Sequence, residues 1–164
     1  MIKHPIEPVY NSESRILILG SFPSVKSREN MFFYGHPQNR FWRVLAEIFM
    51  QPLPVTIEDK KQFLLDNHIA IWDVIKQCDI RGSQDSSIEN VVPNDISIIL
   101  ENANIERIFV NGKKAWQLFN QFIKPSINRE AIYLPSTSPA NAMWSLDKLV
   151  ESWSIINLHT KLSE

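Results

Sequence analysis

Short apolar runs alternate along the chain with longer segments in which apolar residues recur at helical spacing. The runs cover residues 15–19, 68–75, 105–110 and 131–134. A continuous run of this length, without polar alternation, predicts a parallel strand that is buried on both faces. We expect residues 15–19, which Gly20 closes, to form the central strand.

The helical segments follow polar residues that suit an N-cap. Asn39, Thr56, Asn94 and Ser145 each precede apolar residues at helical spacing, and residues 116–122 repeat the pattern. A side-chain oxygen at the N-cap accepts a backbone N–H group that the first helical turn leaves unpaired. We therefore predict a helix after each of these residues and one more around residues 116–122.

The order of strands and helices predicts the fold class. Strands that are separated by helices favour right-handed crossovers and a parallel sheet covered on both faces. We therefore predict a three-layer α/β/α fold with a four-stranded parallel sheet. No linker, repeat or low-complexity segment interrupts the chain, so residues 1–164 are expected to form one domain. Residues 21–31 form a polar link to the next segment, and residues 77–90 are predicted to be a long loop.

Residues that suit ligand binding stand at the ends of the predicted strands. Gly20, Asp73, Asn111 and Ser136 close or follow the four apolar runs. In an open α/β sheet, the carboxyl ends of the strands form the ligand crevice. We expect these four residues to share one rim.

The composition limits the chemistry of any site. The net charge is -1 over 164 residues, so a nucleic acid would be held by a local basic face and not by a global positive field. The single cysteine, Cys78, permits no intrachain disulfide and no cysteine-based zinc site, and the histidines do not cluster at ligand spacing. We expect no metal and no cofactor. No segment resembles a signal peptide or reaches the ~20 apolar residues of a membrane span, so we expect a cytoplasmic protein without membrane contact.

Residues 32–42 combine five aromatic side chains with one histidine in the order Phe-Phe-Tyr-Gly-His-Pro-Gln-Asn-Arg-Phe-Trp. Gly35 and Pro37 break any regular element in the first half of this stretch. Asn39 suits the start of the helix that follows. We predict an aromatic loop that leads directly into a helix.

Three motifs together resemble those of one enzyme superfamily. They read Gly-Ser-Phe-Pro-Ser at 20–24, Tyr-Gly-His-Pro-Gln-Asn-Arg-Phe-Trp at 34–42 and Leu-Pro-Ser-Thr-Ser-Pro-Ala-Asn at 134–141. The combination resembles the uracil-DNA glycosylase superfamily, within it first the hypoxanthine-DNA (deoxyinosine) glycosylases and next the mismatch-specific uracil and thymine glycosylases. The resemblance implies a monomeric, metal-free enzyme of base excision repair. Such an enzyme rotates a deaminated base out of double-stranded DNA and hydrolyses its N-glycosidic bond; single-stranded DNA is a further candidate substrate.

The resemblance also implies which residues bind the base. Tyr34 lies where relatives place the aromatic ring that stacks on the extruded base. Asp73 lies where many relatives carry an asparagine that reads the base edge. Its carboxylate would accept the ring N–H of hypoxanthine but would not accept from adenine, whose corresponding nitrogen is itself an acceptor. Gly20, Ser21 and Phe22 are expected beside the base.

Phe22 departs from the pattern of the superfamily, since relatives commonly place a water-activating Asp, Asn or Glu at this position. The hypoxanthine branch resembles this sequence in that respect, and there the catalytic amide is assigned to the asparagine that is Asn39 here. An amide carbonyl can orient water without being a strong base. That suffices when cleavage passes through an oxocarbenium-like state that requires stabilised positive charge.

The other motif residues are expected to contact the DNA backbone or to fill the gap that the base leaves. Hydroxyls and backbone amides of the third motif suit phosphate, and its last residues are candidates for a wedge. The predicted DNA-binding residues are Ser24, His36, Ser136, Thr137, Ser138, Pro139, Ala140 and Asn141. Basic residues on the rim segments are candidates for a local phosphate-binding face, namely Lys26, Arg28, Arg40, Arg81, Lys113 and Lys114.

Other interpretations of the same residues stay open. Tyr34 also suits a core position, Asn39 a helix cap and Asp73 a turn. The alternative enzyme is a G:U or G:T mismatch-specific uracil or thymine glycosylase. The alternative of another class is a non-catalytic α/β module that binds a nucleotide or damaged DNA, because Phe22 removes the usual catalytic group.

Overall fold

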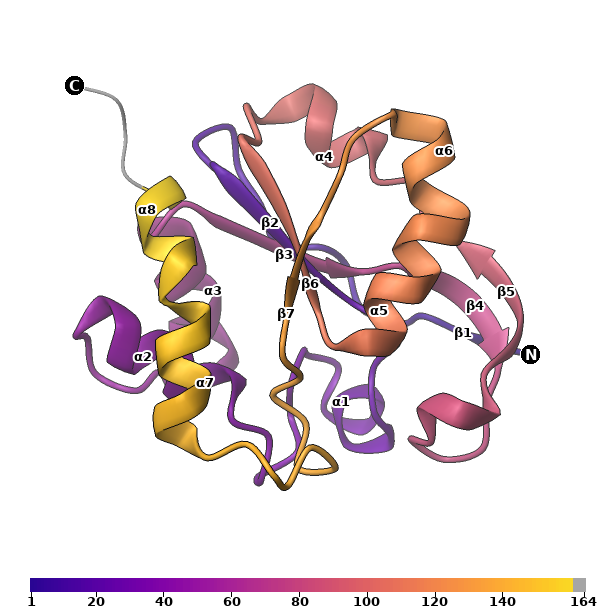
Figure 1. Ribbon diagram of the computed structural model, residues 1–164, viewed down its shortest axis with the longest axis horizontal. Helices are drawn as coiled ribbons and strands as arrows, with labels where there is room; N and C mark the ends of the chain where they lie inside the picture. Colours follow the sequence, from indigo (N-terminus) through magenta and orange to yellow (C-terminus); the bar gives the residue numbers. More distant parts are fainter. Residues whose placement is uncertain (161–164) are drawn as a thin grey trace.

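A four-stranded parallel sheet forms the centre of the structure (Figure 1). The computed structural model describes residues 1–160. In the order β3-β2-β6-β7, the sheet contains β2 (Ile16–Gly20), β3 (Ile69–Asp73), β6 (Arg107–Asn111) and β7 (Ile132–Leu134). All neighbouring pairs run parallel, and β2 lies between β3 and β6, which confirms its prediction as a central strand.

Helices cover both faces of this sheet. Neighbouring residues of a strand point to opposite faces, so Ile16 and Ile18 of β2 pack on one side while Leu17 and Leu19 pack on the other. The first side is covered by α2 (Phe41–Phe49), α3 (Ile57–Asp66) and α7 (Leu146–Trp153), and the second by α4 (Ser97–Asn102) and α5 (Lys113–Leu118). The prediction of a three-layer α/β/α fold is confirmed.

The helices predicted after Thr56 and Ser145 are confirmed together with their caps. Thr56 accepts the N–H of Asp59 at 3.0 Å, and Ser145 accepts that of Lys148 at 3.2 Å. Shorter helical elements complete the chain: α1 (Val25–Asn30), η2 (Phe119–Ile123), α6 (Lys124–Ile127), η3 (Ser154–Ile156) and α8 (Asn157–Thr160). None of the helices within residues 1–160 is long and apolar enough to cross a membrane.

A second, antiparallel sheet was not predicted. It has the order β1-β4-β5, with β1 (Ile2–Lys3), β4 (Ile75–Asp79) and β5 (Glu89–Pro93), and the turn η1 (Asp85–Ser87) lies between β4 and β5. The strand predicted over residues 68–75 is confirmed as β3 but ends at Asp73, and the prediction of a loop over residues 77–90 was wrong because β4 ends and β5 begins within it. The chain bends after Asp73, where the N–H groups of Val74 and Ile75 bond the carbonyls of Gly20 and Ser21 at 2.8 and 3.1 Å.

Asn94 holds this bend and does not cap a helix, so its predicted role was also wrong. Its buried amide donates to the carbonyl oxygens of Asp73 and Ile75 at 2.9 and 3.1 Å. The helix α4 begins only at Ser97, whose N–H is accepted by Asp95 Oδ1 at 3.0 Å. Buried carbonyls beside a bend need a donor, and Asn94 supplies it.

The segment of residues 21–31, for which only a polar link was predicted, contains the helix α1. Ser24 caps this helix, since its hydroxyl accepts the N–H of Ser27 at 3.1 Å. The helix is only six residues long, which is why its apolar pattern is too short to recognise in the sequence.

Candidate active site

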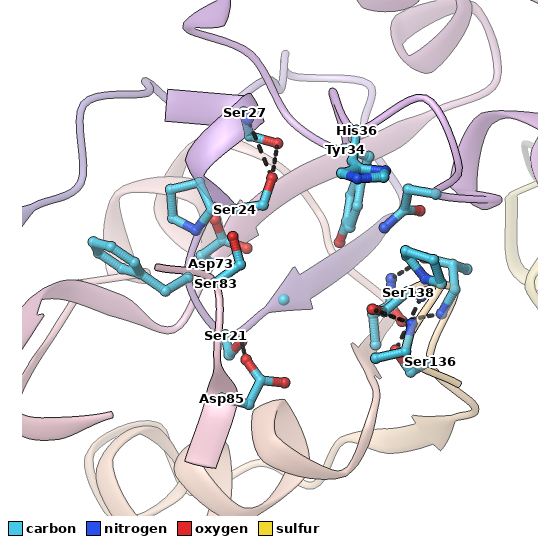
Figure 2. A pocket seen from close by; sticks show the side chains of 18 of the residues that line it. Ser21, Ser24, Ser27, Tyr34, His36, Asp73, Ser83, Asp85, Ser136 and Ser138 are labelled. Atoms are coloured by element: carbon cyan, nitrogen blue, oxygen red, sulfur yellow. Dashed lines mark hydrogen bonds between the residues drawn. The ribbon is translucent and has the colours of Figure 1, made fainter. Parts of the chain in front are cut away.

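The carboxyl ends of the parallel strands surround a cavity of about 790 Å³. Gly20, Asp73, Asn111 and Ser136 all line it, which confirms that they share one rim. Figure 2 shows Tyr34 and His36 on one side of the cavity and Ser136 and Ser138 on another. The predicted site residues that line the cavity are Gly20, Ser21, Phe22, Ser24, Tyr34, His36, Asn39, Asp73, Ser136, Thr137, Ser138, Pro139 and Ala140.

Tyr34 forms an aromatic wall of the cavity. Its backbone adopts a left-handed conformation with φ of 52°, and its ring stacks on Phe41 with centroids 3.9 Å apart and an interplanar angle of 18°. The hydroxyl oxygen is buried and has no hydrogen-bond partner among the described residues. Burial and the negative charge of Asp73 raise the pKa of this hydroxyl. Tyr34 therefore brings an aromatic ring and a protonated hydroxyl to the site.

Asn39 takes part in starting α2 and also lines the cavity. Its Oδ1 accepts the N–H of Phe41 at 2.9 Å, although Arg40 and not Asn39 occupies the N-cap position itself. An amide oxygen has two lone pairs and an amide nitrogen has two donors. After the bond to Phe41, one lone pair and both N–H groups remain for a molecule in the cavity.

Asp73 lies at the floor of the cavity and is only 4% exposed. Its Oδ2 is 2.7 Å from Nε2 of His4, which the sequence analysis did not connect with the site. A Cβ atom on Gly20 would lie 2.5 Å from Asp73 Oδ1 and 3.1 Å from the Tyr34 hydroxyl oxygen. Gly20 therefore allows these two polar groups to approach the end of β2.

His36 and Phe22 form further parts of the wall. The N–H of Gln38 donates to His36 Nδ1 at 3.1 Å, so a proton on the neutral ring belongs on Nε2. Phe22 makes an edge contact with the His4 ring at a centroid distance of 5.8 Å, and the Arg28 guanidinium lies 5.6 Å from its centroid. Phe22 thus closes one side of the cavity with an apolar surface.

The loop that follows β7 uses most of its backbone donors within the protein. The Ser136 hydroxyl accepts the N–H of Ser138, and the Ser138 hydroxyl accepts the N–H of Ala140, each at 3.1 Å. The N–H of Asn141 bonds the carbonyl of Ser138 at 3.0 Å. Both serine hydroxyls still have a proton to donate, so phosphate contacts from this loop would come from hydroxyls and not from these amides.

Thr137 and Asn141 stabilise this loop from within, and their contacts with DNA stay a prediction. The Thr137 side chain is fully buried; its Oγ1 accepts from Asn111 at 3.0 Å, and its N–H donates to Asn111 Oδ1 at 3.1 Å. Asn141 is absent from the residues that line the cavity. Its amide instead donates to the Ser136 carbonyl at 2.9 Å.

Arg40 fastens the same loop to the start of α2. Its guanidinium donates to the carbonyls of Ser138 and Asn141, both at 3.0 Å, and to that of Trp144. Trp153 on α7 anchors the other end of the loop by donating to the Pro135 carbonyl at 2.9 Å. Arg40 was a candidate for the phosphate-binding face, and these contacts give it a structural role in addition.

The connection between β4 and β5 brings residues to the cavity that the sequence analysis missed. Ser83, Gln84, Asp85 and Ser86 line it, and the Ser21 hydroxyl donates to Asp85 Oδ1 at 3.4 Å (Figure 2). The polar character of residues 77–90 was visible in the sequence, but the antiparallel pairing that folds them over the cavity was not. Within residues 1–160, no three His, Cys, Asp or Glu side chains come together as a metal site.

A family model described as the uracil DNA glycosylase superfamily matches residues 7–157 of this chain. That span includes every strand of the parallel sheet and all three motifs at the cavity. The chain belongs to the uracil DNA glycosylase superfamily.

Relatives in this superfamily match nearly the whole chain. A protein of Methanosarcina acetivorans named hypoxanthine DNA glycosylase is 35% identical over 161 residues, which cover 97% of this chain and 100% of the relative. A protein of Methanosarcina barkeri with the same name is 33% identical over 156 residues, covering 94% and 97%. A solution NMR structure from M. acetivorans, described as a candidate uracil DNA glycosylase, matches with a TM-score of 0.82 and 33% identity and covers 98% of this chain and 99% of its own. The sequence and fold of this chain are those of a DNA glycosylase.

Proposed function

We propose that this protein is a monofunctional DNA glycosylase that excises hypoxanthine from DNA that contains deoxyinosine. The observation that carries the proposal is that Tyr34, Asn39 and Asp73, which come from separate parts of the chain, line one cavity. They supply an aromatic ring, a polar amide and a buried acceptor, which are the groups that an extruded base and its attacking water require. The names of the two Methanosarcina relatives support hypoxanthine as the base.

In this proposal the extruded base stacks against Tyr34, and its edge meets Asp73. Hypoxanthine presents a ring N–H beside a carbonyl, so a carboxylate oxygen can accept that N–H. Asn39 orients the attacking water with its free lone pair. Hydrolysis breaks the bond between C1′ of the sugar and N9 of the base; the water oxygen bonds to C1′, and the departing base gains a proton that balances the one lost from water.

The DNA contacts in this proposal come from side-chain donors that the loops do not use in hydrogen bonds within the protein. Ser24 lines the cavity although its hydroxyl caps α1, and Ser136, Ser138 and His36 retain donors for phosphate oxygens. Met143, which is 89% exposed just beyond Asn141, adds an apolar candidate for the wedge to Pro139 and Ala140. We place the protein on double-stranded DNA as a one-domain monomer, with single strands as a secondary substrate.

The proposal is tested with separate duplexes that carry deoxyinosine, uracil opposite guanine, or thymine opposite guanine. Uracil is included because it offers a similar edge, with a ring N–H beside a carbonyl. After incubation with the protein, alkali breaks the strand wherever a base has been removed. We expect breaks at deoxyinosine. Breaks only at uracil or thymine would favour the mismatch glycosylase, and an absence of breaks in all three duplexes would favour the non-catalytic module.

Replacing Tyr34 tests whether its ring is the stacking platform. Base stacking on an aromatic ring contributes ~1–3 kcal/mol, so Tyr34→Ala is expected to weaken binding of a deoxyinosine duplex by about 5-fold to 100-fold in a fluorescence titration. Tyr34→Phe is the matched control. It keeps the ring and removes only the hydroxyl group, so its melting temperature should stay near that of the wild type. Unchanged binding and turnover in Tyr34→Ala would exclude stacking.

A further inference from the structure

His4 and Asp73 form a buried pair behind the wall of the cavity. Nε2 of His4 lies 2.7 Å from Oδ2 of Asp73, and the two side chains are only 3% and 5% exposed. Aromatic rings surround the imidazole, with centroid distances of 5.8 Å to Phe22, 6.0 Å to Phe33 and 6.5 Å to Trp72. Hydrogen bonds in such surroundings are stronger than in water, because little solvent competes for the same groups.

The backbone next to His4 determines which ring nitrogen carries the proton. The N–H of Ile6 donates to Nδ1 of His4 at 3.1 Å. A nitrogen that accepts a hydrogen bond cannot itself carry a proton, so the ring is the neutral form with its proton on Nε2. His4 therefore donates to Asp73 Oδ2. Asp73 acts as the acceptor in this pair, and His4 contributes no positive charge that would cancel the carboxylate.

The second carboxylate oxygen faces the cavity. Asp73 Oδ1 lies beside Gly20, at 2.5 Å from the position that a Cβ atom on Gly20 would take, and Asp73 lines the cavity. Because Oδ2 is bound to His4, rotation of the carboxylate would break a buried hydrogen bond, which is costly. Oδ1 is thus held in one position as an acceptor.

We infer that His4 is a positioning residue that makes Asp73 the determinant of base specificity. Resting on the proposed function, this inference names the edge that the site reads: a ring N–H beside a carbonyl, as in hypoxanthine. The fixed carboxylate accepts this N–H, whereas a base with a ring acceptor at that place, such as adenine, brings two lone pairs together and is rejected. Guanine presents the same edge as hypoxanthine, so its exclusion depends on the space around its exocyclic amine.

Two substitutions of His4 separate its two hydrogen bonds. In His4→Gln the side-chain amide nitrogen can take the place of Nε2 and donate to Asp73, but the acceptor for Ile6 is lost. In His4→Asn the amide oxygen can take the place of Nδ1 and accept from Ile6, but the donor to Asp73 is lost. Both replacements are neutral amides, and each removes one buried bond. If His4 had only a structural role, the two variants should lose similar amounts of stability and of affinity for deoxyinosine.

The experiment compares excision in the wild type and both variants under single turnover, with deoxyinosine and with unsubstituted purine, which lacks the ring N–H, at the same position of a duplex. We expect the half-saturating enzyme concentration for deoxyinosine to rise about 10-fold to 100-fold in His4→Asn and only a few-fold in His4→Gln. The fold-change in the maximal rate should be smaller than the fold-change in the half-saturating concentration. The ratio of deoxyinosine excision to purine excision should fall in His4→Asn alone. Equal behaviour of the two variants would overturn the inference.

Two further outcomes keep the inference separate from the proposed function. If the wild type releases no hypoxanthine, the proposed function fails irrespective of His4. If the wild type is active and His4→Asn retains its affinity and preference, only the role of His4 fails. A long-range ¹H–¹⁵N spectrum of the wild type tests the pair without any reaction: we expect the His4 proton on Nε2, and a proton on Nδ1 would contradict the inference even if both variants failed to fold.

Discussion

Replacing Asn39 with alanine is expected to reduce excision of hypoxanthine about 100-fold to 1000-fold, which is the usual effect of removing one preorganised polar group that acts in the transition state. The substitution also removes the acceptor for the Phe41 N–H, so the free energy of unfolding should fall by ~0.5–2 kcal/mol. Single-turnover excision from a deoxyinosine duplex and thermal denaturation measure the two effects separately.

Asn39→Ser provides the matched control for this prediction. A serine hydroxyl can accept the Phe41 N–H much as the amide does, but it is too short to reach a water at the sugar and it lacks the amide. We expect Asn39→Ser to melt near the wild type and still to lose excision. Full activity in this variant would show that Asn39 matters only for the start of α2.

Replacing Gly20 with alanine is expected to reduce excision strongly, because it displaces Asp73 at the floor of the cavity. The added methyl group would lie 2.5 Å from Asp73 Oδ1, and the carboxylate cannot move away without leaving His4. Displacement of a binding group by about 1 Å can cost roughly 100-fold in rate, so we expect at least that loss in excision. Overpacking should also cost ~1–3 kcal/mol in the free energy of unfolding.

Gly82→Ala is the control for Gly20→Ala. Gly82 has φ of 58°, and a Cβ atom there meets no atom within 4 Å, so the variant adds the same methyl group in open space. We expect a loss of about 1 kcal/mol from the strained backbone conformation and near-normal excision. Wild-type activity in Gly20→Ala, measured beside this control, would show that the floor tolerates a side chain and that the base binds elsewhere.

The sequence was sufficient to predict the parallel sheet and its rim. The strands around Ile16, Ile69, Ile108 and Ile132 are short, apolar and separated by helical segments, so local pattern and topology lead to the same arrangement. Once the strands are parallel, their carboxyl ends meet, and the residues at those ends must surround one crevice. That is why Gly20, Asp73, Asn111 and Ser136 could be grouped before their contacts were known.

The second sheet could not be predicted because no local pattern specifies it. β1 has two residues, and β5 reads Glu-Asn-Val-Val-Pro, which suits an exposed edge as well as a loop. Their pairing with β4 depends on contacts between residues as distant as Ile2 and Cys78. The pairing of β1 with β4 also brings His4 to Asp73. The contact between these two residues could therefore not be predicted from a single histidine near the N-terminus.

The hydrogen bonds that loop residues form could likewise not be predicted from the sequence. Ser136, Thr137 and Ser138 look equivalent in the sequence, and all three line the cavity. The Thr137 side chain, however, is fully buried and bonded to Asn111, while the two serine hydroxyls keep a proton to donate. Arg40 is of a residue type that often binds phosphate, but its guanidinium donates to three carbonyls of the neighbouring loop. Whether a side chain bonds within the protein or faces the cavity depends on which groups the fold places beside it.

Because Arg40 and Trp153 anchor the loop after β7, we expect the DNA and not this loop to distort when the protein binds a duplex. A segment whose carbonyls are already bound has lost its conformational freedom during folding, so ordering it adds little entropic penalty on association. The loop after β7 is then the rigid partner, and the DNA is the partner that deforms. Helix bending and loss of stacking should be concentrated at the lesion, where a weakly paired base yields most easily.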